Sequence, residues 1–214
     1  MSNALKIALF GATGMIGSRI AAEAARRGHE VTALVRHPER VAAAAKVRAA
    51  KADLLDAKGV ADAVRGHDLV ASAYAPPQDR LADLDVATRA LLDGVRAAGL
   101  KRVVTVGGAG SLEVAPGKQL VDTEGFPDAY KPTALAHREA FRAIRTVDDL
   151  DWTVFAPAAI IAPGERTGQF RTGANALLAD ANGDSRISAE DYAIAFVDEL
   201  EQGRFVRQLA TVAY

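Results

Sequence analysis

Three glycines spaced three residues apart stand where a short apolar run gives way to a helical pattern. Gly11, Gly14 and Gly17 occur in the stretch ALFGATGMIGSRI, and the next apolar run starts at Glu30. A glycine-rich turn between a strand and a helix is where a dinucleotide-binding protein approaches pyrophosphate. In that interpretation Gly11 allows the tight turn, Gly14 leaves room for the phosphates, and Gly17 lets the helix pack on the strand.

The first turn of that helix is where an anion would bind. Its free backbone N–H groups, around Met15 and Ile16, face outward, and Thr13 stands in the turn itself. We therefore expect the turn to hold the pyrophosphate of a dinucleotide. A plain strand-to-helix turn is the alternative.

The end of the second apolar run indicates which nicotinamide cofactor is bound. The run continues as VTALVRHPER, which places Arg36 19 residues after Gly17 and Arg40 one turn further on. An enzyme that uses NAD carries Asp or Glu here, because a carboxylate accepts a hydrogen bond from the ribose 2′-hydroxyl. A guanidinium binds a 2′-phosphate instead, so NADPH is the expected cofactor. Two solvated surface arginines are the alternative.

These residues must be positioned by a regular alternation of strands and helices. Strands are expected at 5–10, 30–35, 47–52, 68–73, 102–107 and 152–157, with a last one near 205–212. Helices are expected at 15–27, 80–98, 133–147 and 188–201. Nearly continuous apolar strands with βα alternation predict an α/β fold, a Rossmann-type doubly wound parallel sheet with helices on both faces. We expect a single NAD(P)-binding domain over residues 1–214, with a Gly- and Pro-rich functional loop at 158–186.

The carboxyl ends of the strands are the expected ligand edge of such a sheet. Ala73 and Tyr74 follow the fourth strand and should therefore lie beside the cofactor. Tyr74 could equally be a packed aromatic residue at the edge of the sheet.

The bulk composition excludes several classes of protein. The 214 residues carry a net charge of −1 and include no cysteine. Near-neutral charge argues against a nucleic-acid partner, and the absence of cysteine excludes a thiolate metal site or nucleophile. No apolar run approaches the ~20 residues that cross a bilayer, so we expect a cytoplasmic protein without membrane contact.

One segment has the outline of a calcium-binding loop. DANGDSRISAED, residues 180–191, places Asp180 and Asp191 at the first and last loop positions. Ser185 stands where the sharp turn needs glycine, and Asp191 is shorter than the usual bidentate Glu. We expect no metal, and instead interpret Ser188 and Asp191 as N-cap and N3 of the final helix.

Several motifs resemble those of one protein family. GATGMIG, AYAPP and VVTVGGAGS are similar to segments of the extended and atypical short-chain dehydrogenase/reductases. APAAIIAPGERTGQFRTG, GDSRISAEDYAIAFVDELE and the terminal VRQLATVAY narrow the likeness to the NAD(P)H–flavin reductase family, relatives of biliverdin reductase B and the NmrA-like proteins. The likeness extends over essentially the whole chain and implies a Rossmann fold with a nicotinamide cofactor.

The resemblance also implies roles for individual residues. Asp53 and its neighbour Leu54, in KADLLD, should lie beside adenine, although a turn or N-cap aspartate is an equal alternative. The 158–186 segment should cover the substrate side of the nicotinamide. Further cofactor contacts are expected at strand ends of the same edge, at Gly107, Gly108 and Pro157.

Two arginines of this segment could bind an anionic substrate. Arg166 and Arg171 lie in PGERTGQFRTG, and either would match a flavin phosphate or a carboxylate. Hydrogen bonds from these arginines to loop carbonyls are the alternative.

The catalytic pair of typical short-chain dehydrogenases is missing. Their Tyr-x-x-x-Lys motif would need lysine four residues after Tyr130, where Ala134 stands; Lys131 is adjacent and points away on a helix. Tyr130 is therefore a weak candidate for a proton donor. Ser111, in GGAGS, and His137, on the following helix, are the other candidates, with a turn serine and a helix histidine as alternatives.

This pattern favours hydride transfer to an acceptor that needs no strong acid. We expect an NADPH-dependent oxidoreductase whose small-molecule acceptor is a flavin, a quinone or a similar conjugated system, with FMN or FAD as substrate rather than prosthetic group. A regulator that senses NADP(H) without turnover is the alternative. A nucleotide-sugar epimerase or dehydratase is disfavoured, because that chemistry uses the missing pair. The chain is expected to be a monomer or homodimer.

Overall fold

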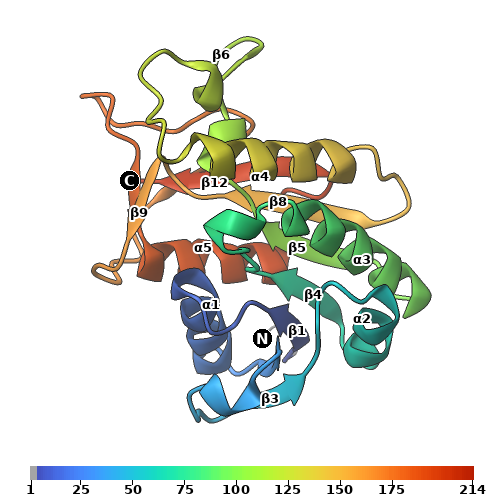
Figure 1. The fold of residues 1–214 in the computed structure, drawn as a ribbon. Coiled ribbons are helices and arrows are strands. Elements are labelled where there is room, and N and C mark those ends of the chain that lie inside the picture. Colours follow the sequence, from blue (N-terminus) through green and yellow to red (C-terminus); the bar gives the residue numbers. More distant parts are fainter. Residues whose placement is uncertain (1–3) are drawn as a thin grey trace.

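The computed structural model describes residues 4–214, whose centre is one eight-stranded sheet (Figure 1). The strand order is β3-β2-β1-β4-β5-β8-β12-β10. In chain order these strands are β1 (Lys6–Phe10), β2 (Glu30–Val35), β3 (Val47–Lys51), β4 (Leu69–Ser72), β5 (Arg102–Val106), β8 (Asp151–Ala156), β10 (Arg171–Ala174) and β12 (Gln208–Ala213).

The predicted Rossmann-type α/β fold is confirmed. Every neighbouring pair in the sheet is parallel except β10 and β12, which run antiparallel. The chain proceeds outward from β1 through β2 and β3, then returns to β4 on the other side of β1. This reversal is the topological switch point, and the crevice at the carboxyl ends of β1 and β4 is where such sheets bind ligands.

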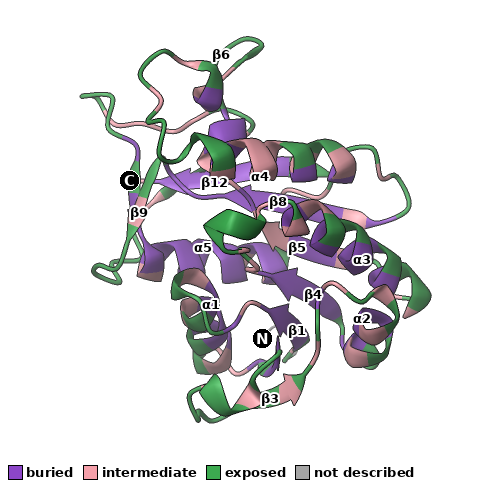
Figure 2. Ribbon diagram, viewed as in Figure 1, coloured by how far each residue is buried: buried purple, intermediate pink, exposed green. Residues whose placement is uncertain are grey.

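Five helices cover the two faces of the sheet (Figure 1). Helices α1 and α5 pack on one face, and the other three share a separate core on the opposite face. Burial follows this arrangement, with buried strands at the centre and exposure on the outer sides of the helices (Figure 2). The helices are α1 (Met15–Arg26), α2 (Ala57–Val64), α3 (Asp83–Ala97), α4 (Lys131–Ile144) and α5 (Ala189–Gln202).

Two predicted helices have different limits in the structure. The helix predicted at 80–98 starts at Asp83, because residues 78–80 form a separate 3₁₀ turn. The helix predicted at 133–147 starts at Lys131, with Pro132 in its first turn, and ends at Ile144. Proline is tolerated there, since the first helical N–H groups have no partner within the helix.

The segment predicted as a long loop at 158–186 is more regular than expected. It holds β9 (Ile160–Ala162), all of β10, and the first residue of β11 (Arg186–Ser188), which pairs in parallel with β9. Since β10 adds to β12 as an antiparallel edge strand, the sheet is mostly rather than wholly parallel. A separate two-stranded hairpin consists of β6 (Glu113–Ala115) and β7 (Lys118–Gln119).

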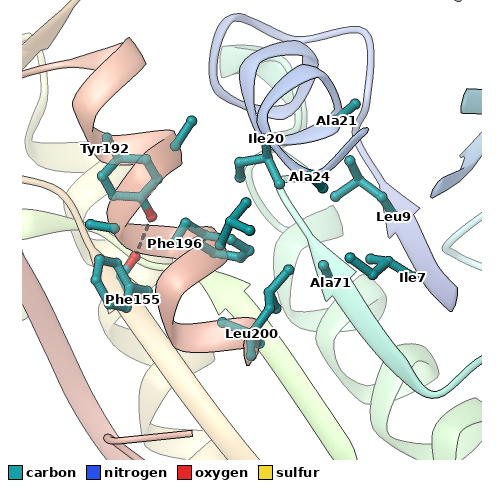
Figure 3. Close-up of a cluster of buried hydrophobic side chains, with 14 of the residues drawn as sticks. Ile7, Leu9, Ile20, Ala21, Ala24, Ala71, Phe155, Tyr192, Phe196 and Leu200 are labelled. Carbon is teal, nitrogen blue, oxygen red and sulfur yellow. Dashed lines mark hydrogen bonds between the residues drawn. The ribbon is translucent and has the colours of Figure 1, made fainter. Parts of the chain in front are cut away.

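An aromatic cluster fastens α5 to the sheet (Figure 3). The ring of Phe155, on β8, meets those of Tyr192 and Phe196 edge-on, at centroid distances of 5.7 and 5.9 Å. The Tyr192 hydroxyl donates to the Phe155 carbonyl at 2.6 Å, so its polar end is satisfied in the core. All three side chains are fully buried, and they hold the start of α5 close to the carboxyl end of β8.

We predict that this cluster is a principal source of stability. Phe196→Ala removes a fully buried ring and should lower the free energy of unfolding by about 3–5 kcal/mol. Val86→Ala, at an exposed position of α3, should change it by less than about 0.5 kcal/mol. Urea unfolding followed by circular dichroism measures both, and equal effects of the two substitutions would contradict the assignment.

Candidate functional site

The glycine turn between β1 and α1 is fixed by backbone packing. Gly11 has φ +75°, a conformation that side chains disfavour. A Cβ atom added to it would lie 2.4 Å from the carbonyl oxygen of Ala73, at the end of β4. Gly11 therefore allows both the tight turn and the close approach of two neighbouring strand ends.

Gly17 and Gly14 serve different purposes. A Cβ on Gly17 would lie 2.1 Å from the carbonyl oxygen of Gly11, so the helix packs here directly on the turn. A Cβ on Gly14 would meet only that same oxygen, at an ordinary 3.5 Å. The fold itself thus leaves room for a side chain at Gly14, and the space above it is a cradle that a phosphate can enter.

The start of α1 presents unpaired donors beside this cradle. The first hydrogen bond of the helix runs from the N–H of Ser18 to the carbonyl of Gly14, at 3.0 Å. The N–H groups of Met15, Ile16 and Gly17 precede that ladder. Gly14 supplies no capping side chain, and the first turn contains no acidic residue that would repel an anion. The predicted geometry for a pyrophosphate is present.

A groove at the carboxyl ends of β1, β2, β3 and β4 adjoins this turn. It encloses about 740 Å³, counting the space open to solvent. Its lining includes eight of the predicted cofactor residues, namely Gly11, Thr13, Gly14, Arg36, Asp53, Leu54, Ala73 and Tyr74. Ala75, expected with Ala73 and Tyr74 at the end of the fourth strand, also lines it, and residues that were not predicted complete it, namely Phe10, Leu34, Val35, Ala52 and Leu55. Each of these lies within two residues of a predicted one, so the strand ends were the signal that locates them.

The two predicted 2′-phosphate ligands occupy different positions. Arg36 is exposed and lines the groove directly after β2. Arg40 is exposed at the end of a 3₁₀ turn, Pro38–Arg40, and does not line the groove. Glu39, the nearest acidic residue in sequence, is paired with His37 at 3.3 Å. Arg36 is therefore the better placed of the two cations.

Asp53 and Tyr74 frame the far side of the groove. The Oδ1 atom of Asp53 accepts the N–H of Leu55 at 3.0 Å, so this aspartate closes a local turn, while Asp56 takes the N-cap position of α2. Tyr74 is half-buried, and its pKa is raised by burial and then by the negative charge of Asp83. It stays a neutral phenol that can pack against a ligand.

The remaining predicted cofactor residues lie at the same edge, outside the groove. Pro157 is buried directly after β8. Gly107 packs against Val154, and a Cβ on Gly108 would lie 2.9 Å from the Cβ of His137. These two glycines therefore let the end of β5 approach its neighbours. Their cofactor contacts, and that of Pro157, stay a prediction.

Ser111 and His137 come together where the 3₁₀ turn after β5 packs on α4. The Ser111 hydroxyl is buried without a hydrogen-bond partner among residues 4–214. Burial lowers the pKa of His137 to about 4, so its imidazole is neutral at pH 7. His137 lines a small cavity of about 390 Å³ that shares Leu54 and Tyr74 with the groove. The neutral imidazole thus lies beside the groove, whereas Ser111 lines neither the groove nor this cavity.

Tyr130 lies directly before α4 and outside the regular helix. It caps the start of α4 and is 66 % exposed. Its backbone carbonyl accepts the N–H of Ala134, the residue that replaces the motif's lysine. The tyrosine–lysine proton relay is absent from this helix.

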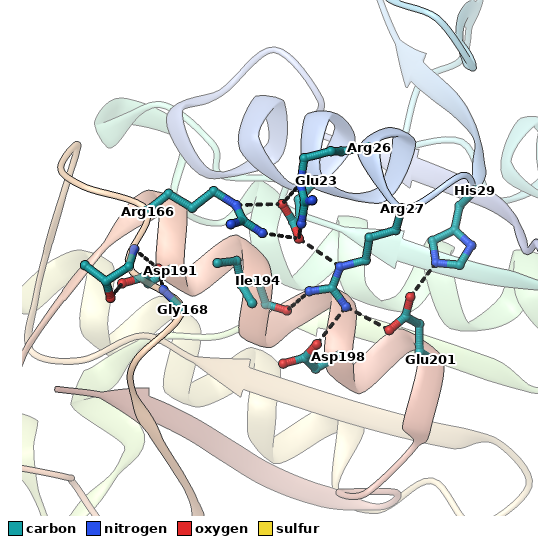
Figure 4. Close-up of polar contacts among 11 residues, drawn as sticks. Glu23, Arg26, Arg27, His29, Arg166, Gly168, Asp191, Ile194, Asp198 and Glu201 are labelled. Carbon is teal, nitrogen blue, oxygen red and sulfur yellow. Dashed lines mark hydrogen bonds and ion pairs between the residues drawn. The ribbon is translucent and has the colours of Figure 1, made fainter. Parts of the chain in front are cut away.

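The two arginines of the 158–186 segment both bind groups of the same chain, and Figure 4 shows the contact of Arg166. Arg166 forms a bidentate ion pair with Glu23 of α1, with both N···O distances at 3.1 Å. Arg171 donates to the carbonyl oxygens of Ala179 and Tyr214, at 2.8 and 2.6 Å. Both side chains tie the segment to its surroundings, as in the structural alternative, and substrate binding by them stays a prediction.

The segment that resembles a calcium loop uses its carboxylates for hydrogen bonds. Asp180 accepts the N–H groups of Asn182 and Asp184. Ser188 caps α5 by accepting the N–H of Asp191 at 3.0 Å, as predicted. Within residues 4–214 no group of three His, Cys, Asp or Glu side chains is arranged to hold a metal ion, and no helix there is long and apolar enough to cross a membrane.

Comparison with known proteins places this geometry in a family. A family model described as NAD(P)H-binding matches residues 11–202, which include the whole glycine turn. The chain belongs to the NAD(P)H-binding family. The predicted membership of an NAD(P)-binding reductase family is thereby confirmed.

Relatives resemble the chain along its full length. Protein YwnB of Bacillus subtilis is 40 % identical over 217 residues, which cover 97 % of this chain and 98 % of YwnB. A Burkholderia pseudomallei structure, provisionally named an exported protein, is 68 % identical with a TM-score of 0.92 and covers 98 % of this chain and 100 % of its own. A Streptococcus pneumoniae structure, provisionally named an NADH-flavin reductase, is 33 % identical with a TM-score of 0.88. The match covers 98 % of this chain and 99 % of the Streptococcus chain. These findings support an NAD(P)H oxidoreductase in general.

The contrast between Gly14 and Gly17 gives a matched pair of substitutions. Gly14→Val should keep the fold, at a capping cost of about 1 kcal/mol, and abolish NADPH binding, because its side chain fills the phosphate cradle. Gly17→Val should instead unfold or strongly destabilise the protein, because the turn has no space for a Cβ. Calorimetric titration and thermal unfolding separate the two, and normal NADPH affinity in Gly14→Val would refute the placement of the phosphates.

The lowered pKa of His137 predicts a specific dependence of stability on pH. The unfolded histidine binds a proton near pH 6.5, whereas the folded one resists protonation until about pH 4. The free energy of unfolding should therefore fall as the pH decreases from 6.5 to 4, by up to about 3 kcal/mol from this group. Urea titrations across that range should show a shallower decline for His137→Asn. Parallel curves for the two proteins would show that His137 titrates normally.

Proposed function

We propose that the protein is an NADPH-dependent oxidoreductase that delivers hydride to a planar conjugated acceptor such as a flavin or a quinone. The observation that carries the proposal is the contrast between a turn and groove that fit a dinucleotide and a missing strong acid. The cradle at Gly14 and the donors of α1 fit a pyrophosphate, while α4 holds no tyrosine–lysine pair. An acceptor that is already electrophilic asks for only a weak proton donor.

Each part of the site has a stated task in this proposal. Bound NADPH supplies the hydride. The N–H groups of Met15 and Ile16 hold the pyrophosphate, and Arg36 binds the 2′-phosphate at the rim of the groove. Tyr74 packs against the cofactor between the groove and the cavity of His137.

The proton that follows the hydride needs a donor of modest strength. The Ser111 hydroxyl, buried without a partner among residues 4–214, can donate to an acceptor that reaches it, and solvent then restores its proton. The neutral His137 lines the cavity beside the groove and can donate a hydrogen bond from its ring N–H, while burial disfavours the cationic imidazole that would act as a stronger acid. Catalysis then rests mainly on holding acceptor and cofactor in contact.

A regulator that senses NADP(H) is the second candidate. The same missing pair supports it, since binding needs the cradle and the groove but no proton donor. A Bacteroides thetaiotaomicron structure that is provisionally named an epimerase is 39 % identical to this chain, with a TM-score of 0.92. The match covers 99 % of this chain and 98 % of the Bacteroides chain. Epimerase activity is less compatible with the missing tyrosine–lysine pair.

We further propose that the protein acts on a small molecule as a monomer or homodimer in the cytoplasm, without nucleic-acid or membrane partners. The net charge of −1 supports the absence of a polyanion partner. One relative is provisionally named an exported protein, so cell fractionation of the producing organism is the direct test of location.

Cofactor choice is the first prediction of the proposal. Wild type should bind NADPH at least about tenfold more tightly than NADH, a difference of about 1.4 kcal/mol, because Arg36 stands directly after β2, where an enzyme that uses NAD carries a carboxylate. Arg36→Ala should weaken NADPH selectively, and Arg89→Ala, on the exposed side of α3, should leave both affinities unchanged. Equal calorimetric affinities of wild type for the two cofactors would contradict the assignment.

Acceptor choice is the second prediction. FMN or a small quinone should be reduced and simple ketones should not, because the site lacks a strong acid. Tyr130→Phe should lower kcat by less than about tenfold, against the 10²–10⁴-fold expected for a general acid. Ser111→Ala should lower it more than Tyr130→Phe does. Tight NADPH binding without reduction of any acceptor would favour the sensor instead.

A further inference from the structure

We propose that the first turn of α5 is a clamp that fixes residues 164–168 as a wall of the acceptor site, with Asp191 as its central positioning residue. The nature of the acceptor rests on the proposed function, whereas the clamp rests on contacts within the chain. The clamp explains why the segments PGERTG and SRISAED occur together, because each binds the other.

Asp191 is the most heavily bonded residue of this turn. Its carboxylate is fully buried, and its Oδ1 atom accepts the backbone N–H groups of Thr167 and Gly168, both at 2.8 Å. Its Oδ2 atom accepts the hydroxyl of Thr167 at 2.5 Å and the hydroxyl of Tyr214 at 3.0 Å. Four neutral donors and the positive end of the α5 dipole thus stabilise one buried charge.

Two further residues of the turn hold the beginning of the segment. The Ser188 hydroxyl donates to the carbonyl of Glu165 at 2.7 Å while it also caps α5. Glu190 accepts the N–H of Gly164 at 2.7 Å and the Nε–H of Arg19 at 2.5 Å. A segment with glycine at 164 and 168 is therefore fixed largely through its backbone.

A second attachment joins the segment to the cofactor helix (Figure 4). Arg166 extends across to Glu23 of α1, which is almost fully buried and also pairs with Arg26 and Arg27. These arginines and that of the segment hold the pKa of Glu23 well below its usual range, so the carboxylate is charged throughout the physiological range. Arg166 thus connects the segment to α1 through an ion pair, which argues against the prediction that it binds an anionic substrate.

The position of the segment follows from the same contacts. Arg19, which shares Glu190 with Gly164, also donates to the carbonyl of Met15 at 2.9 Å. The segment is thereby linked to the first residue of the anion-binding helix. In the proposed function the adenosine half of a dinucleotide would occupy the groove beside Arg36, so its nicotinamide half would cross the switch point toward β5 and β8. Residues 164–168 come after β8 and β9 in the chain, and the proposal places them on that side.

A wall in this place has a direct consequence for hydride transfer. The acceptor ring must stay in contact with the cofactor, with its position maintained to within a fraction of an ångström. A mobile wall would not maintain that alignment. Since Asp191 lies in α5 and does not line the cofactor groove, its loss should loosen the wall without weakening cofactor binding.

The test compares Asp191→Asn with Asp198→Asn, a substitution in the same helix whose partly exposed carboxylate pairs with Arg27. In the cofactor-free protein, amide hydrogen exchange of Thr167 and Gly168 should accelerate at least about tenfold in Asp191→Asn and stay unchanged in Asp198→Asn. With menadione as acceptor, KM should rise at least about tenfold in Asp191→Asn, while the Kd for NADPH stays within about twofold.

The outcomes separate the clamp from the proposed function. Unchanged exchange at Thr167 and Gly168 overturns the clamp, whether or not any acceptor is reduced. Faster exchange with an unchanged KM overturns the role of the segment as an acceptor wall. If Asp191→Asn fails to fold, Thr167→Val replaces it, since it removes one donor to the same carboxylate; its exchange at Gly168 should accelerate, and Thr167→Ser should restore the wild-type rate.

Discussion

The contact between the backbones of Gly17 and Gly11 is the constraint on which the rest of the site depends. A Cβ on Gly17 would lie 2.1 Å from the Gly11 carbonyl oxygen, so α1 starts as close to the turn as two backbones allow. Gly11 in turn lies against the end of β4, where its own Cβ would strike Ala73. The start of α1 is thereby fixed above the switch point, with its unpaired N–H groups over the crevice.

Helix α5 extends this fixed arrangement to the other half of the site. Its aromatic residues pack on Phe155 of β8, and its first turn binds the segment that follows that strand. Ion pairs connect it to α1, where Arg27 meets both Asp198 and Glu201 at 2.7 Å (Figure 4). The two helices on this face thus form one unit, which joins the phosphate cradle to the opposite wall. Many of the ion pairs in this unit are partly buried, and salt screens such pairs less than it screens pairs at the surface.

The sequence was sufficient for the fold, for the glycine turn and for most of the polar lining of the groove, because these depend on local patterns. Continuous apolar runs predicted six strands of the central sheet within one or two residues, and the glycine spacing located the turn. Arg36 and Tyr74 could be placed because residues that end parallel strands must share an edge. The groove residues that were missed, such as Leu34 and Ala52, are apolar or small and carry no chemical signal of their own.

The substrate half could not be obtained in the same way, because its order comes from contacts distant in sequence. Arg166 is the type of residue that binds anions. Its structural role becomes visible only through its ion pair with Glu23, which is 143 residues away in the sequence. The regular strands within 158–186 form by pairing with β11 and β12, which no local pattern indicates. Ser111 was named from its position in a glycine-rich turn, but its lack of a partner emerges only when α4 is packed over it.

The central claim is that the N-terminus of α1 binds the pyrophosphate of the cofactor. The most direct measurement is a titration of the ¹⁵N-labelled protein with NADPH, followed by amide chemical shifts. The largest changes should occur at the amides of Met15, Ile16 and Gly17, with further changes along the groove beside Arg36. Saturable binding that left those three amides unperturbed would place the cofactor elsewhere and contradict the account.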